Sequence, residues 1–330
     1  MKAWRLNENG EPQDVLRLDE VDDPRPGPGQ LLVRVLATPV NFPDVLLCRG
    51  EYQIKPPLPF TPGVELCGEV VEVGEGVADF SPGDRVLGSA SLPTGGFAEL
   101  ALMDAPRTFP APESLSDAEA ASLFIGYQTG HFGLHRRANL RAGETLLVHA
   151  AAGGVGSAAI QLGKAAGAKV IGVVGGPRKA EVAAELGADL VVDRRSEDFV
   201  PVVKEFTGGK GADVVYDPVG GETYAKSTKC IAFEGRILVI GFAGGTIPTP
   251  GLNHALIKNY SIVGLHWGLY NERNPQLVVD AHRDLTRLAD EGLIRPLISE
   301  RLPLDAVADA VRRVGEGSTV GRVAYDAAAS

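Results

Sequence analysis

A glycine-rich turn at Gly153, Gly154, Val155 and Gly156 is the part of this sequence whose spacing most directly suggests chemistry. An apolar run over 146–150 precedes it, and apolar residues then recur at helical spacing, which predicts a strand, a tight turn and an amphipathic helix. The N-terminus of a helix attracts anions, and glycines let the backbone approach a pyrophosphate. The turn is therefore a dinucleotide site or a tight connection without a ligand. Ala151 stands where the usual fingerprint has its first glycine.

The end of the next predicted strand, at 174–176, bears on the choice of dinucleotide. An Asp or Glu at this position accepts hydrogen bonds from the ribose 2′-hydroxyl of NAD, and it repels a 2′-phosphate. The sequence has Gly175 and Gly176 there instead, and Arg178 and Lys179 follow within one turn. Two cations without the acid favour NADPH over NADH, whereas the same cations on a bare helix start would be solvated surface charges.

The elements that must position these residues alternate along the chain. Strand-like runs at 169–174, 190–193, 213–217, 236–241 and 261–265 are mostly separated by helical stretches, which predicts an α/β fold with a doubly wound parallel sheet. The first part of the chain consists of short strands broken by Gly and Pro, a pattern typical of a small β-barrel.

A capping box at Ser116 and Glu119 predicts that a helix begins near Asp117, where the first boundary lies. Strand-rich segments occur at both ends of the chain. We therefore expect residues 268–330 to complete a domain of residues 1–120, with a Rossmann domain of residues 121–267 inserted between them.

Composition excludes several classes of function. The 330 residues carry a net charge of −10 and no basic cluster, so no nucleic-acid partner is expected. No apolar run approaches the roughly 20 residues of a membrane-spanning helix, and no signal core is present, which predicts a cytoplasmic protein without a membrane partner. The three cysteines, Cys48, Cys67 and Cys230, lack CxxC spacing and are expected to be free thiols.

Several segments carry a family resemblance: NFPDVLLCRGEYQ at 41–53, PLPFTPGVELCGEV at 57–70, AAGGVG at 151–156, DVVYDPVGG at 213–221 and IKNYSIVGLHWG at 257–268. They resemble the zinc-free quinone oxidoreductases of the medium-chain dehydrogenase/reductase superfamily, relatives of zeta-crystallin. The resemblance implies a Rossmann doubly wound parallel sheet inserted in a GroES-like β-barrel domain. It also implies NADPH as cofactor, a small-molecule quinone or conjugated carbonyl as substrate, and a homodimer joined through the last Rossmann strand.

Zinc-dependent members of that superfamily use a cysteine and a Gly-His-Glu motif. Here the positions that resemble the motif are Gly63, Val64 and Glu65, and the segment from Asn41 to Asp44 occupies the region of the cysteine. Without Cys or His ligands, no catalytic zinc is expected. The implied reaction is hydride transfer from NADPH to a quinone. The alternatives are reduction of a C=C bond in an enal, enone or enoyl thioester, and a non-catalytic NADPH-binding or structural role.

The resemblance also implies the site residues. Asn41 and Tyr52 would lie beside the nicotinamide and hydrogen-bond a developing oxyanion, with Tyr52 or solvent as the proton donor. From the residue types alone, Asn41 is equally a turn residue and Tyr52 a half-buried aromatic. The implied cofactor contacts, from the nicotinamide carboxamide at Thr129 to the adenine region at Arg194, are Asn41, Thr129, Gly153, Gly154, Val155, Gly156, Gly175, Arg178, Lys179, Arg194, Ile240, Gly241, Phe242, Ala243, Leu265, His266 and Trp267.

Overall fold

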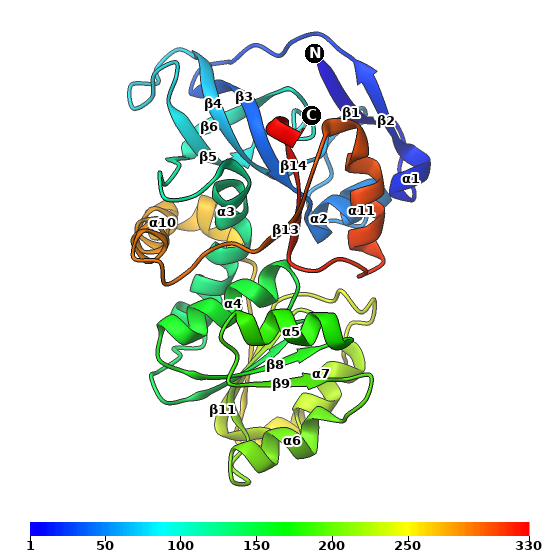
Figure 1. Cartoon of the computed structure of the whole chain (residues 1–330), viewed down its shortest axis with the longest axis vertical. Helices are drawn as coiled ribbons and strands as arrows, with labels where there is room; N and C mark the ends of the chain where they lie inside the picture. Colours follow the sequence, from blue (N-terminus) through cyan, green and yellow to red (C-terminus); the bar gives the residue numbers. More distant parts are fainter. Residues whose placement is uncertain (330) are drawn as a thin grey trace. The chain divides into compact units, whose positions relative to one another are not determined.

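The computed structural model describes residues 1–329, which form two compact units. Unit 1 combines residues 1–125 with the segment that begins at Pro296, and unit 2 consists of Gly126–Arg295. The long helix α3 (Asp117–His131) contains the boundary between them. Both ends of the chain belong to unit 1 (Figure 1), so the inserted arrangement that the sequence predicts is present.

Unit 1 is built mainly from β-strands, and strands from distant parts of the sequence pair in one sheet. Its strands are β1 (Lys2–Leu6), β2 (Leu16–Glu20), β3 (Gln30–Pro39), β4 (Glu65–Val73), β5 (Arg85–Ala90), β6 (Leu100–Pro110), β13 (Ile298–Leu302) and β14 (Arg322–Asp326). Its helices are α1 (Pro12–Val15), α2 (Phe42–Arg49), the first part of α3, α11 (Val307–Gly315), and the short 3₁₀ turns η3 (Leu304–Ala306) and η4 (Ala327–Ala329).

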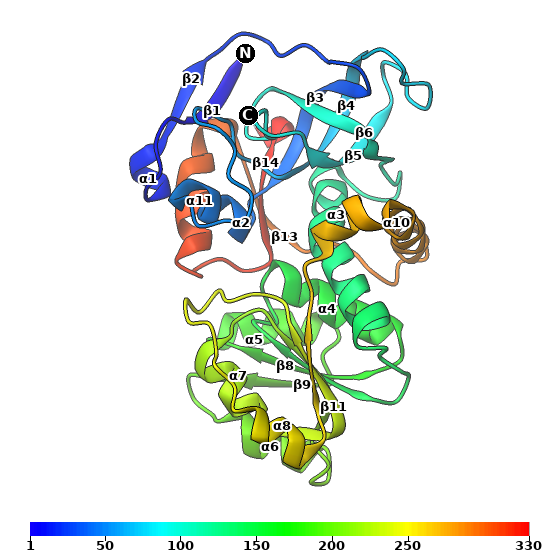
Figure 2. The ribbon, with the colours of Figure 1, turned by 180° about the vertical axis from the view of Figure 1, so that it is seen from behind.

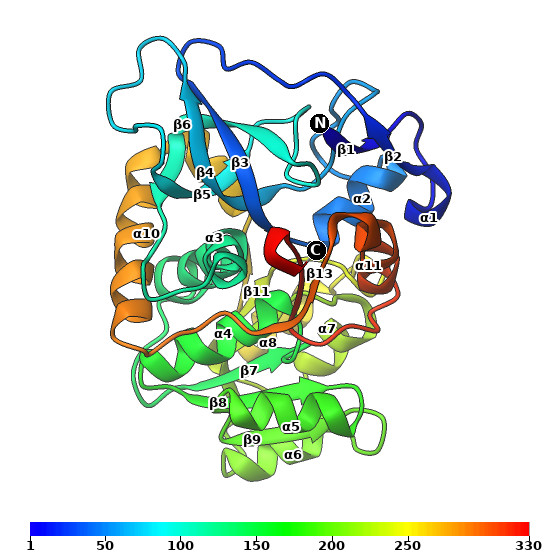
Figure 3. The ribbon, with the colours of Figure 1, turned by 45° about the horizontal axis from the view of Figure 1, so that its top comes forward.

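The main sheet of unit 1 closes on itself. Its strands follow the order β13-β14-β3-β4-β5-β6, and β3 pairs with β6 as well as with β4. Strands β3 to β6 therefore form the barrel that the sequence predicts, which Figure 3 shows beside α2 and α11. The core inside unit 1 includes residues from both ends of the chain, such as Leu31 and Val323.

Unit 2 alternates strands and helices. Its strands are β7 (Thr145–His149), β8 (Lys169–Val174), β9 (Leu190–Asp193), β10 (Ala212–Asp217), β11 (Ile231–Val239) and β12 (Ser261–Gly264). Its helices are the end of α3, the π-helix η1 (Phe132–Arg137), α4 (Gly154–Ala165), α5 (Pro177–Glu185), α6 (Phe199–Phe206), α7 (Gly221–Ser227), α8 (Leu252–Lys258), the 3₁₀ turn η2 (Trp267–Leu269), α9 (Tyr270–Arg273) and α10 (Pro275–Asp290).

The sheet of unit 2 is parallel throughout its described strands, in the order β12-β11-β10-β7-β8-β9. Helices α4 and α5 cover one face, and α6 and α7 cover the other (Figure 1). The central strands β7 and β10 are buried along their whole length, as expected for strands with helices on both faces. This is the predicted doubly wound Rossmann sheet, whose ligands bind at the carboxyl ends of the strands.

Two boundaries differ between expectation and structure. The helix at Asp117 begins as predicted, because the backbone N–H and the hydroxyl of Ser116 both donate to the Glu119 carboxylate, at 2.9 and 2.8 Å. The units, however, divide at 125/126 and 295/296, whereas the sequence placed the limits at 120/121 and 267/268. Helix α10 accounts for the larger difference, because its Val278 carbonyl and Asp284 carboxylate bond Gln128 and His131 of α3 within unit 2.

Candidate functional site

The glycine turn of unit 2 joins β7 to α4. Ala150 has φ of +49°, and its carbonyl accepts a hydrogen bond from Gly153 N–H at 2.8 Å. A Cβ at Gly156 would lie 2.2 Å from the Ala150 oxygen, so only glycine lets the helix start this close to the strand. Helix α4 begins at Gly154 with Gly153 as its N-cap, and, as at any helix start, its first backbone N–H groups have no partner within the helix. The turn has the form that holds a pyrophosphate.

The turn between β8 and α5 gathers positive charge. A Cβ built at Gly175 would lie 3.4 Å from a guanidinium nitrogen of Arg194, and one built at Gly176 would lie 3.1 Å from Arg195. Burial and the two nearby guanidiniums lower the pKa of the Lys179 ammonium. Neither arginine forms a salt bridge within the described chain. The turn therefore presents three cations beside the glycine-rich backbone, a composition suited to a phosphate.

Sequence analysis missed Arg195 and the residue that places it. Asp193, the last residue of β9, accepts hydrogen bonds from the N–H groups of Gly176 and Arg195, at 2.8 and 3.0 Å. These bonds lower the pKa of the Asp193 carboxyl and fold the chain after β9 over the β8–α5 turn. Arg178 is exposed on the first turn of α5. The adjacent pair Arg194 and Arg195 after a strand was the signal that could have revealed the cluster.

The residues implied for the nicotinamide half lie after β11 and β12. Ile240 and Leu265 both approach Gly133 of η1, because a Cβ built there would lie 3.6 and 3.5 Å from their side chains. The loop that includes Gly241 and Phe242 is tied to the turn after β10, since Ala243 N–H donates to the Pro218 carbonyl at 3.0 Å. Thr129 and Trp267 are buried, while Phe242 and His266 are exposed. Unit 2 thus brings Ile240 and Leu265 together on one side of η1.

In unit 1, the side-chain amide of Asn41 is engaged in hydrogen bonds within the protein. Its amide nitrogen donates to Glu65 Oε1 at 2.9 Å and to the Pro39 carbonyl at 3.2 Å. Its amide oxygen accepts a hydrogen bond from Arg322 Nη1. Asn41 is 4% exposed, so this amide is a buried, fully paired link between neighbouring strands.

Two carboxyls to which the sequence analysis assigned no role, Asp44 and Glu65, lie next to Asn41. Asp44 accepts hydrogen bonds from the N–H groups of Asn41, at 2.8 Å, and Gly63, at 3.0 Å. Its burial, reinforced by the charge of Glu65 and opposed by these bonds, raises the pKa of Asp44 to about 7. Burial likewise raises the pKa of Glu65, although the Arg322 guanidinium opposes the shift. The sequence could not reveal this cluster, because Arg322 lies 281 residues from Asn41.

Tyr52 lies in the loop that follows α2. It is half-buried and packs against the core of unit 1. Burial, and next the charge of Asp44, raise the pKa of its phenol, which therefore stays protonated at neutral pH. Its hydroxyl has no hydrogen-bond partner in the part of the chain that the structure describes. Of the two residues expected to act on the substrate, Tyr52 is the one with an uncommitted donor.

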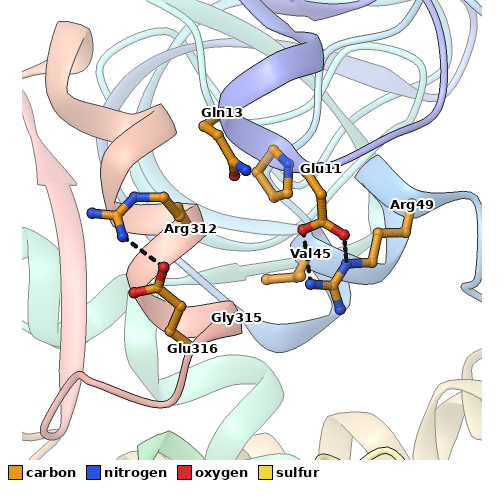
Figure 4. Close-up of a pocket in the computed structure, with 8 residues that line it drawn as sticks. Glu11, Gln13, Val45, Arg49, Arg312, Gly315 and Glu316 are labelled. Atoms are coloured by element: carbon orange, nitrogen blue, oxygen red, sulfur yellow. Dashed lines mark hydrogen bonds and ion pairs between the residues drawn. The ribbon is translucent and has the colours of Figure 1, made fainter.

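A separate small hollow of about 80 Å³, open to solvent, lies between α1, α2 and α11 (Figure 4). Its charged side chains are paired with one another, Arg49 with Glu11 and Arg312 with Glu316, both through hydrogen bonds shorter than 3.1 Å. These charges are already balanced, so the hollow offers no free group for catalysis.

Residues 1–329 lack two further kinds of feature. No three His, Cys, Asp or Glu side chains lie together as metal ligands, and none of the helices combines the length and the apolar character that crossing a membrane requires.

Comparisons with known proteins define the class and then the family. The family described as alcohol dehydrogenase GroES-like domain matches residues 27–113, and the one described as zinc-binding dehydrogenase matches residues 154–282, the two halves of a medium-chain dehydrogenase/reductase. Quinone oxidoreductase-like protein 2 homolog of Nematostella vectensis is 40% identical over 324 residues, which cover 98% of this chain and 88% of the relative. The chain belongs to the zinc-free quinone oxidoreductase family of that superfamily.

Solved structures agree with this assignment. The Escherichia coli quinone oxidoreductase complexed with NADPH has a TM-score of 0.90 and 30% identity, covering 99% of this chain and 100% of that one. A mycobacterial protein complexed with NADPH has a TM-score of 0.91 and 32% identity, with coverage of 99% and 100%. Structural neighbours of this chain therefore include proteins with NADPH bound.

Proposed function

We propose that this protein is an NADPH-dependent quinone oxidoreductase that works without a metal ion. The observation that carries the proposal is the cluster of Lys179, Arg194 and Arg195 around the β8–α5 turn. A 2′-phosphate distinguishes NADPH from NADH, and a group of cations at this turn favours the phosphorylated cofactor. The close start of α4 at Gly156 fits the pyrophosphate, because a side chain there would fill the space.

The bound cofactor supplies hydride from its nicotinamide, and the protein supplies orientation and a proton. A quinone needs little polarisation, because its π-system delocalises the negative charge that hydride addition creates. The Tyr52 hydroxyl has no hydrogen-bond partner among the described residues, so it is suited to hydrogen-bond the acceptor oxygen, and Tyr52 or solvent then supplies the proton. Asn41 has both amide hydrogens engaged, and we assign it to holding the site together.

The test is the initial rate of NADPH oxidation with an ortho-quinone and, in parallel, with a conjugated enal. NADH replaces NADPH as the cofactor control. We expect turnover on the quinone with NADPH preferred. Turnover on the enal alone would move the protein to the C=C reductases with the same site residues. Inactivity on both, with NADPH still bound, would support a non-catalytic role.

We also propose that the protein forms a homodimer through the free edge of β12. Strand β12 lies at the end of its sheet, and helix α8, labelled in Figure 2, directly precedes it in the chain. Exposed apolar side chains occur on β12 and on the two elements that come before it: Phe233 on β11, Leu252, Leu256 and Ile257 on α8, and Ile262 on β12. An unpaired edge beside apolar residues favours pairing with a second copy.

Light scattering after size exclusion tests the dimer. We expect a dimeric mass for the wild type and a monomeric mass for Leu256→Glu, because the substitution would bury two carboxylates at a two-fold interface. Leu293→Glu is the matched control, since Leu293 is also exposed in unit 2 but lies outside the patch. A monomeric wild type, or a dimer that Leu256→Glu leaves intact, would contradict this interface.

A further inference from the structure

We propose that Glu65 is a positioning residue of the reaction and acts through Asn41. This inference rests on the proposed function. Glu65 is completely buried on β4, and its two oxygens reach different elements. Oε1 accepts from the Asn41 amide at the start of α2, at 2.9 Å, and Oε2 accepts from Ile125 N–H of α3, at 2.6 Å. A single carboxylate thus joins three elements of unit 1.

The fourth element is β14, through Arg322. Its guanidinium is 6% exposed, donates from Nη1 to the Asn41 amide oxygen, and has Nη2 3.8 Å from Glu65 Oε1. Among residues 1–329, Nη2 has no hydrogen-bond partner. Asn41 is therefore clamped between an acceptor and a donor of opposite charge, which leaves its amide one orientation. A swapped amide would point its NH₂ at the guanidinium and its oxygen at the carboxylate.

Stability alone does not explain this arrangement. Removing a carboxylate and a guanidinium from water carries a large desolvation penalty, and apolar side chains of similar volume often stabilise a fold as well or better. Such a cluster does fix geometry, because every partner has a defined direction. The element it fixes is the start of α2, where Asn41 N–H also donates to Asp44. The loop with Tyr52 follows directly after α2. The clamp, meaning Glu65 and Arg322 on either side of the Asn41 amide, therefore fixes the position of the helix that carries this loop.

The test is a double-mutant cycle on turnover with NADPH and an ortho-quinone. We expect Glu65→Gln to lower kcat about 10- to 100-fold, the effect of misplacing a reacting group by about 1 Å, with the Kd of NADPH changed less than about twofold. In an Asn41→Ala background, Glu65→Gln should lower kcat little further, because the Asn41 amide through which Glu65 acts has already been removed. Glu72→Gln on the exposed part of β4 is the matched control and should resemble wild type.

A second measurement keeps the proposal independent of activity and of how well Glu65→Gln folds. In wild-type protein labelled with ¹⁵N-asparagine, the side-chain amide hydrogens of Asn41, identified by their absence in Asn41→Ala, should exchange with solvent much more slowly than those of exposed asparagines. Rapid exchange, or equal losses of kcat from Glu65→Gln in both backgrounds, would overturn the proposal. Protected amide hydrogens in a protein inactive on quinones would instead overturn the proposed function and leave the clamp standing.

Discussion

At the scale of single residues, unit 1 contains two buried carboxyls with shifted pKa values. Asp44 and Glu65 are both fully buried, and each has a raised pKa. An unfolded Asp has a pKa of about 3.9. Because the folded pKa of Asp44, about 7, lies above that value, the folded state binds the proton more tightly between about pH 4 and about pH 7.

The free energy of unfolding should therefore gain a contribution from Asp44 at low pH and lose it as the pH rises towards 7. In Asp44→Asn this contribution is absent, so the stability difference between wild type and variant should shift against the wild type by up to about 1.4 kcal/mol per pH unit. Urea unfolding of both proteins between about pH 5 and about pH 8 measures it. Parallel pH curves would show that Asp44 titrates normally.

Residue by residue, the sequence reveals what local spacing determines. Gly153, Gly154 and Gly156 were recognisable because a tight strand–helix turn requires glycine at positions that are close together in the sequence. Arg322 and Glu65 were not recognisable as partners, because the barrel brings them together only after the distant strands β14 and β4 join one sheet. Contacts of this kind depend on topology, which residue type and spacing do not encode.

At the scale of elements, the Asp193 carboxylate joins the β8–α5 turn to the end of β9, and we propose that these two segments together select the cofactor. The double substitution Arg194→Gln and Arg195→Gln should raise the KM for NADPH about tenfold or more and leave the KM for NADH nearly unchanged, since charge-assisted hydrogen bonds contribute about 1.5–3 kcal/mol. Steady-state kinetics with both cofactors measures the effect. Lys229→Gln, which removes an exposed cation elsewhere in unit 2, is the control. Equal losses for both cofactors would argue against a phosphate role.

The alternation of strands and helices was predictable element by element, because apolar periodicity records which face is buried. The start of α3 was predictable too, because its cap is a local signal. The side-chain directions at the end of β9 were not predictable from the sequence. They depend on a hydrogen bond that the N–H of Gly176, in the turn after β8, donates to Asp193. The assignment of α10 to unit 2 likewise follows from its packing on α3 and not from any break in composition.

At the scale of the whole molecule, the two units differ in self-sufficiency. A core cluster of unit 2 draws its buried residues from Leu147 to Tyr260, whereas the core of unit 1 also needs Val311 and Tyr325 from the last part of the chain. A fragment of residues 117–295 should therefore unfold cooperatively by circular dichroism. A fragment of residues 1–125 should show no cooperative transition until a peptide of residues 296–330 is added. Cooperative unfolding of residues 1–125 alone would contradict this dependence.

The return of β14 to β3 also orders events during biosynthesis. A ribosome releases residues 1–125 first, then the whole of unit 2, and only afterwards the strand that completes the barrel. Domains generally fold as units while the chain emerges. Unit 2 can therefore fold before the barrel of unit 1 is complete, because β14 follows unit 2 in the chain. Arg322 is synthesised after all of unit 2. The hydrogen bonds that fix the Asn41 side chain between Glu65 and Arg322 are therefore among the last contacts of the new chain to form.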